Sequence, residues 1–170
     1  MKKKVIILIA IGLIVIGSVI ALLIHNKGGK REKSLLVVAS NYSFKIGATY
    51  GGTAIFDDGT IYTWYYSSTK SEYNGYVGNY SINTKDGFTK FVMDKATKSE
   101  KNVSKGDLKQ INKYIKNISE KDVNCDIDYN KYSSITIYKN NEVIKLDMSD
   151  ACDVNANIKE LSSLINKYKK

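Results

Sequence analysis

Proline is absent from this 170-residue chain, arginine occurs once, and the only histidine is His25. Without a histidine after residue 33, histidine-dependent catalytic triads are excluded from that region, and a zinc site there is not expected. The sequence also lacks a CxxC pair, a glycine-rich phosphate loop and an arginine-rich cluster. The usual signatures of thiol redox enzymes, nucleotide binding and nucleic-acid binding are therefore missing. We expect a protein that is not an enzyme, uses no cofactor and binds no nucleic acid.

The longest apolar run in the chain covers residues 5–24 and carries no charge. As a helix with a rise of about 1.5 Å per residue, this run spans roughly 30 Å, the thickness of a bilayer's hydrocarbon core. We predict a transmembrane signal-anchor helix over 5–24, preceded by a basic cytoplasmic segment over 1–4 and followed by a basic flexible tether over 25–33. Cleavage after Ala21 is the alternative, because small residues occupy the right positions before it.

Most of the positive charge flanks this apolar run. The formal net charge is +9, and residues 1–33 contribute seven basic residues and one acidic residue to it. Basic residues beside a membrane segment contact lipid headgroups, so the bilayer is the first expected partner. The basic residues on the two sides nearly balance, and the position of the run at the amino terminus favours an outside location for the domain 34–170. The heavy use of Lys, Asn, Ile and Tyr is typical of an AT-rich bacterial genome.

Residues 34–170 are enough for one small domain with one core. Apolar runs and period-two alternation predict strands over 35–39, 53–56, 60–66, 76–81, 88–94, 133–138 and 142–148. Asp58-Gly59 predicts a type I′ hairpin, and Asn140-Asn141 predicts a second hairpin turn.

Two segments have a helical period instead. Apolar residues every three to four positions predict a helix over 105–118, with Ser104 as its N-cap, and a second helix at the carboxyl end, with Asn157 in the capping position. Because hairpin connections dominate, we predict an α+β domain with a mainly antiparallel sheet and both helices packed on one face.

Cys125 and Cys152 are the only cysteines and flank the second predicted hairpin. If Asn140 and Asn141 form its turn, paired positions sum to 281, and Cys152 lies opposite Tyr129, four residues from Cys125. An oxidising compartment outside the membrane would then favour a structural disulfide at the base of the hairpin. Unpaired thiols and a redox pair are the alternatives.

Acidic residues gather near this predicted bridge. Weak metal candidates among them are Asp126, Asp128, Asp150 and Asp153. Clustered oxygens suit Ca²⁺, and the spacing Asp126-x-Asp128-x-Asn130 matches the start of a calcium loop. The match then fails, because Lys131 occupies the glycine position and Ile137 the glutamate position. Turns and helix caps explain the same residues, so no metal is expected.

Aromatic residues crowd the region 50–80, and the candidate binding residues there are Tyr62, Trp64, Tyr66 and Tyr76. An exposed Tyr/Trp face on a sheet stacks against sugars or anchors a protein. The alternative is a core role, since aromatics favour strands. We expect a membrane-anchored extracytoplasmic binding or accessory domain that contacts an envelope protein or a cell-wall glycan through its sheet. A membrane-anchored inhibitor or immunity-type protein against a secreted toxin or hydrolase is the alternative function.

Overall fold

The computed structural model describes residues 32–44, 47–128, 130–139, 142–149 and 152–169. The predicted anchor over 5–24 and its basic flanks up to residue 31 lie outside this part of the chain. Within the described residues, no helix has the length and apolar character needed to cross a membrane. Lys33–Lys170 form one unit, to which the fold below refers.

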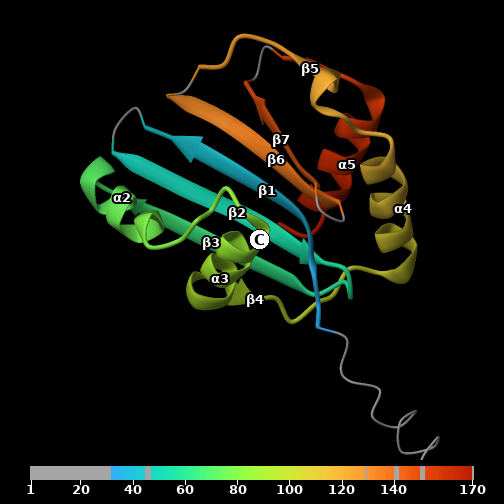
Figure 1. Ribbon diagram of the computed structural model, residues 1–170, viewed down its shortest axis with the longest axis horizontal. Helices are drawn as coiled ribbons and strands as arrows, with labels where there is room; N and C mark the ends of the chain where they lie inside the picture. Colours follow the sequence, from blue (N-terminus) through green and yellow to red (C-terminus); the bar gives the residue numbers. More distant parts are fainter. Residues whose placement is uncertain (1–31, 45–46, 129, 140–141, 150–151, 170) are drawn as a thin grey trace, which may run out of the picture. The chain divides into compact units, whose positions relative to one another are not determined.

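Six strands form a sheet in the spatial order β4-β3-β2-β1-β6-β7, and every neighbouring pair is antiparallel (Figure 1). The strands are β1 (Leu35–Ser43), β2 (Ala48–Phe56), β3 (Ile61–Ser68), β4 (Thr97–Lys98), β6 (Lys131–Lys139) and β7 (Glu142–Met148). Two further short strands, β5 (Val123–Asn124) and β8 (Asp153–Val154), pair with each other after a 3-10 turn at Glu120–Asp122. The predicted antiparallel sheet is confirmed.

The hairpin between β6 and β7 has the predicted register. Ser133 pairs with Met148 and Lys139 with Glu142, so paired positions sum to 281 as expected, although the turn at 140–141 lies outside the described residues.

The hairpin between β2 and β3 differs from the predicted type I′ turn because its loop has three residues, 57–59. Phe56 N–H donates to the Thr60 carbonyl at 2.9 Å, and Gly59 N–H donates back to the Phe56 carbonyl at 2.9 Å. Gly59 has a φ of 83°, a left-handed conformation that glycine adopts at little cost. The Asp58 carboxylate accepts two 2.8 Å hydrogen bonds from Thr60, which favours this longer loop.

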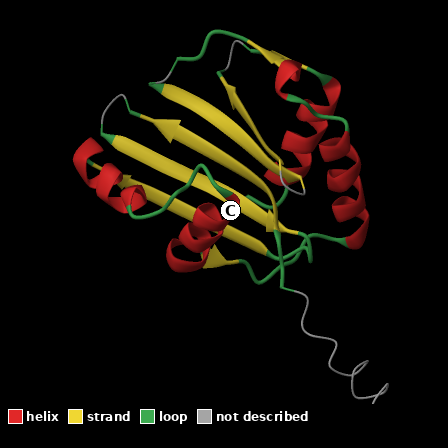
Figure 2. Cartoon of the chain, viewed as in Figure 1, coloured by secondary structure: helices red, strands yellow, loops and turns green. Residues whose placement is uncertain are grey.

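Four helices pack on the sheet, two on each face (Figures 1 and 2). The helices are α2 (Lys70–Gly78), α3 (Lys85–Lys95), α4 (Lys105–Lys116) and α5 (Ala156–Asn166). The two predicted helices, α4 and α5, do share one face, and they stand side by side at the right of Figure 1. The prediction of only two helices is wrong, because α2 and α3 cover the other face.

The segments predicted as strands over 76–81 and 88–94 fall within or beside α2 and α3. Phe88, Phe91 and Val92 have the i, i+3, i+4 spacing of a helix, and all three are buried. Thr84 Oγ1 accepts a hydrogen bond from Gly87 N–H at 3.1 Å and caps α3. The β-favouring residue types of this segment therefore carry less weight than its cap and its helical spacing.

Adjacent residues of the strands belong to two different cores. Val37 packs in an aliphatic core beneath α4 and α5, while Val38 packs in an aromatic core beneath α2 and α3. Ile55 and Phe56 divide in the same way. This is the period-two alternation of a sheet that is covered on both sides. We call its two surfaces the α4–α5 face and the α2–α3 face.

The predicted N-cap is confirmed for α4 and is wrong for α5. Ser104 Oγ accepts from Asp107 N–H at 3.1 Å and caps α4 as expected. In α5 the cap is Asn155, whose Oδ1 accepts from Ile158 N–H at 3.0 Å, so the predicted cap at Asn157 is wrong by two residues.

Cys125 and Cys152 form a disulfide, with their Cα atoms 4.9 Å apart. The bridge lies directly beside the β5–β8 pairing, in which Asn124 is opposite Asp153. The predicted pairing of the two cysteines is confirmed.

Candidate functional site

Of the four aromatic residues predicted as a binding surface, Tyr62, Trp64 and Tyr66 lie on the α2–α3 face, and Tyr76 lies in α2, which packs on that face. Tyr62 and Trp64 are 8% and 6% exposed, and both belong to the aromatic core. Tyr66 and Tyr76 are half-buried, and their rings stack with centroids 4.1 Å apart. Helices α2 and α3 cover this surface, so the four side chains pack between sheet and helices.

The α4–α5 face is apolar at one end of its strands and polar at the other. Along β1 this face changes from Val37 to Asn41, and along β3 it changes from Ile61 to Thr63 and Tyr65. The polar positions are neighbours in the sheet, because Gly51 of β2 pairs with Asn41 on one side and with Tyr65 on the other. We call this polar end the hydroxyl platform; it consists of Asn41, Thr49, Gly51, Thr53, Thr63 and Tyr65.

A hollow of about 600 Å³ lies on the hydroxyl platform. Lys95 and Thr97 line it at the β3–β4 edge, and Lys169 lines it after the end of α5. A second hollow of about 230 Å³ shares Asn41 and Lys169 with the first and extends along α5. The volume of the first hollow lies within the range of small-molecule binding sites.

Thr53 lines the second hollow and is 1% exposed. Its Oγ1 has no hydrogen-bond partner among the residues that the structure describes. Burying a hydroxyl without a partner costs about 1–3 kcal/mol, so native proteins contain few such groups. A ligand that reaches Thr53 with a donor or acceptor would remove this cost.

Tyr65 is the most exposed aromatic side chain of the described domain, at 75%. Its ring lies against the backbone of Gly51, since a Cβ at Gly51 would be 3.3 Å from Tyr65 Cδ2. The ring therefore stands at the margin of the hollow with much of its surface in contact with solvent. Exposed rings of this kind are favoured contact points for ligands.

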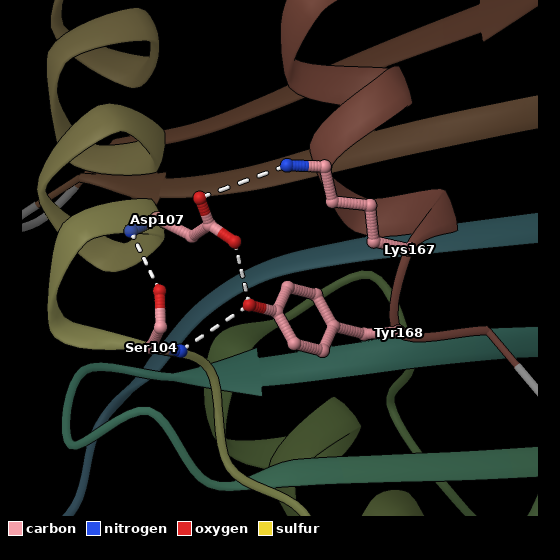
Figure 3. A network of polar contacts seen from close by, with 4 residues as sticks. All are labelled: Ser104, Asp107, Lys167 and Tyr168. Carbon is pink, nitrogen blue, oxygen red and sulfur yellow. Dashed lines mark hydrogen bonds and ion pairs between the residues drawn. The ribbon is translucent and has the colours of Figure 1, made fainter.

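The end of α5 is tied to the start of α4, as Figure 3 shows. Tyr168 OH donates to Asp107 Oδ2 at 2.7 Å and accepts from Ser104 N–H at 3.2 Å. Lys167 Nζ lies 3.8 Å from Asp107 Oδ1. This network places the next residue, Lys169, at the rim of the hollow.

The two hollows are lined by hydroxyl and amide side chains, one exposed aromatic ring and two lysines. Among the described residues that line them, none is a carboxylate, a histidine or a cysteine. The arrangement can hydrogen-bond, stack and attract negative charge. It is suited to holding a ligand.

The acidic residues near the disulfide are placed apart from this site. Asp126, Asp128 and Asp153 are exposed, and Asp150 lies outside the described residues. Asp128 Oδ1 accepts from both the backbone and the side-chain nitrogen of Asn130, at 2.9 and 3.0 Å, as in a turn. In the described part of the chain, no three His, Cys, Asp or Glu side chains are grouped to hold a metal ion.

The residues of the hydroxyl platform were not among the predicted site residues. In sequence, these residues resemble the solvent-facing side of an ordinary strand. The one signal that distinguishes the platform is that aliphatic side chains give way to hydroxyl side chains along the same face of several strands. No protein family model matches the chain, and neither does any curated protein or solved structure.

Proposed function

We propose that this protein is a non-enzymatic binding domain, anchored in the membrane by residues 5–24, that contacts an envelope component through the hydroxyl platform. The envelope component is a cell-wall glycan or an envelope protein. The observation that supports this function is the 600 Å³ hollow on the platform. It carries the exposed Tyr65 and adjoins the buried hydroxyl of Thr53, which has no hydrogen-bond partner among the described residues.

The shape of the α4–α5 face supports this proposal. Helices α4 and α5 pack on its aliphatic end, and the polar end keeps Asn41 and Tyr65 exposed. A sheet surface with small side chains lets a flat ligand approach the backbone closely. The polar groups then provide specificity, while the aromatic ring provides apolar contact area.

A binding experiment with the full-length chain in non-ionic detergent tests the function. Cell walls isolated from the cells that make the protein, and a solubilised envelope fraction, serve as ligands. We expect one of them to retain the protein, and we expect Tyr65→Ala to weaken retention about tenfold, as for an aromatic hot spot. Val143→Ala, which shortens an exposed side chain on the opposite face, is the matched control and should leave binding unchanged.

Equal retention of the wild type and the Tyr65→Ala variant would overturn the proposed site. Retention of neither by any envelope fraction would overturn the function itself. If the only bound component is a secreted hydrolase that loses activity on binding, the inhibitor function replaces the proposed one.

The outside location has its own test in intact cells. A membrane-impermeant thiol reagent should label Cys125 and Cys152 only after reduction, and without lysis, because the two form a disulfide. Labelling that requires lysis would place the domain in the cytoplasm and contradict the envelope function.

A further inference from the structure

We propose that the ligand of the hydroxyl platform is an anionic polyhydroxylated chain, that is, a glycan or polyol polymer carrying phosphate or carboxylate groups. This inference rests on the proposed function and specifies its ligand. Lys95 and Lys169 bind the negative charges, while the neutral platform between them binds hydroxyl groups.

Among the described residues, the charged side chains that line the platform are all basic. The charged residues lining the two hollows are Lys95 and Lys169. Two adjoining hollows share Asn41 or Ser133 with these, and one of them adds Lys159. No acidic residue is among the described residues that line any of the four. Such a surface attracts anions and disfavours a cationic ligand.

The two rim lysines reach the same hollow from different elements. Lys95 is the last residue of α3 and lines the hollow at the β3 edge, while its Nζ lies 5.6 Å from the centre of the Tyr76 ring, on the α2–α3 side of that edge. Lys169 follows the tethered Tyr168 at the end of α5. A chain that crosses the platform from Lys169 and continues over the β3 edge meets Lys95 there, so a polymer with repeated negative charges would meet a cation at each end of its path.

The neutral part of the platform favours hydroxylated ligands over simple polyanions. Threonine hydroxyls both donate and accept hydrogen bonds, and so do sugar or polyol hydroxyls. Thr53 Oγ1 is buried and has no hydrogen-bond partner in the part of the chain that the structure describes, and Thr49 and Thr63 line the first hollow. Tyr65 offers a ring surface for the C–H face of a sugar. A polyanion without hydroxyls would use the lysines alone.

Isothermal titration of the full-length chain in non-ionic detergent separates these contributions. The probes are dextran, phosphorylated dextran and polyglutamate of similar length. We expect phosphorylated dextran to bind at least tenfold more tightly than either of the others, with an affinity that falls as salt rises. The double variant Lys95→Gln/Lys169→Gln should bind phosphorylated dextran about tenfold more weakly than the wild type does, and its affinity for dextran should be unchanged.

Lys113→Gln/Lys116→Gln, which removes the same charge from exposed positions of α4, is the matched control and should bind as the wild type does. Tyr65→Ala should weaken binding of both dextrans. Tyr168→Phe, which removes the hydroxyl contacts that position Lys169, should weaken only the phosphorylated probe.

Equal affinity for dextran and phosphorylated dextran would overturn the requirement for charge, and equal affinity for polyglutamate would overturn the requirement for hydroxyls. If none of the probes binds while envelope retention still depends on Tyr65, the proposed function stands and the ligand class is wrong. If none of the probes binds and envelope retention does not depend on Tyr65 either, both the proposed site and the proposed ligand class are wrong.

Discussion

Gly52 is the position at which a single side chain would disturb both the sheet and the aromatic core. It pairs with Trp64 across β2 and β3, and the indole ring lies over the glycine. The same ring makes edge contacts with Phe88 and Phe91, at centroid distances of 5.7 and 5.6 Å. A Cβ at Gly52 would collide with the Trp64 ring and lie 2.5 Å from the backbone oxygen of Ala39. The missing side chain is thus a packing requirement, because a backbone oxygen cannot move aside without disturbing the strand.

We expect Gly52→Ala to lower the free energy of unfolding by about 1–3 kcal/mol, the usual cost of overpacking a core. Urea denaturation followed by the fluorescence of Trp64, the only tryptophan, measures this change. Gly75→Ala is the matched control, because nothing lies within 4 Å of a Cβ at that position. It should be neutral or stabilise α2 by up to about 1 kcal/mol. A Gly52→Ala variant as stable as the wild type would contradict the packing argument.

At the scale of elements, the β5–β8 ribbon is one of the shortest strand pairings of the fold. Each strand has two residues, and a pairing this short is not stable by itself. The disulfide between Cys125 and Cys152 lies next to it and joins residues 27 positions apart. Ser149 N–H also donates to Cys152 Sγ at 2.9 Å. The covalent link therefore holds the base of the β6–β7 hairpin where hydrogen bonds alone are few.

Reduction of this disulfide should lower the free energy of unfolding by about 3.5 kcal/mol, the chain-entropy value for a loop of this length. The measurement compares urea midpoints with and without a reducing agent. The double variant Cys125→Ser/Cys152→Ser should be destabilised to a similar extent, and reductant should not change it further. A variant with the midpoint of the oxidised wild type would show that the ribbon does not need the bridge.

Considered as a whole, the domain has a row of tyrosines that crosses four strands on the α2–α3 face. Tyr42 pairs with Tyr132 on β6 and with Tyr50 on β2, and Tyr50 pairs with Tyr66 on β3. The Tyr42 ring stacks on those of Tyr132 and Tyr50 at 4.5 and 4.8 Å. Burial raises the pKa of Tyr42 and, further, that of Tyr50, because ionised phenols lose hydration there.

The same cause raises the pKa of Tyr73 and Tyr138. A raised pKa in the folded state means that unfolding releases protons at high pH. These buried, neutral phenols therefore make their full contribution to the free energy of unfolding below about pH 10, the usual tyrosine pKa. The contribution is lost as pH rises above that value. We expect a lower urea midpoint at pH 11 than at pH 8, and a smaller decrease for Tyr42→Phe/Tyr138→Phe. Equal midpoints at the two pH values would show that these phenols ionise as readily in the folded state as in the unfolded state.

The two faces of the sheet also differ at this scale. Helices α2 and α3 pack on aromatic side chains, while α4 and α5 pack on aliphatic ones. The aliphatic area ends part of the way along β1, β2 and β3, where amide and hydroxyl side chains replace it. The extent of the two helices thus determines where the sheet remains accessible, and this sets the position of the hydroxyl platform.

Several features were determined by the sequence itself, because their causes are local. The period of the apolar residues identified α4 and most of the strands, and Ser104 identified the start of α4. Hairpin symmetry about residues 140–141 established the register that brings Cys152 near Cys125. Each of these depends on residues close together in the chain or on one turn, so one sequence suffices.

Tertiary structure alone decided the helical state of α3 and the position of the candidate site, because both depend on which surfaces meet. The segment around Phe88 and Phe91 has β-favouring residue types, and only its packing against Trp64 shows why it is helical. Alternation shows that Trp64 and Tyr65 point to opposite faces, but it does not show which face a helix will cover. Docking of α2 and α3 buried Trp64, and α4 and α5 end short of Tyr65. The predicted aromatic surface is therefore core, and the candidate site lies on the other side of the sheet, since burial is a property of the assembled elements.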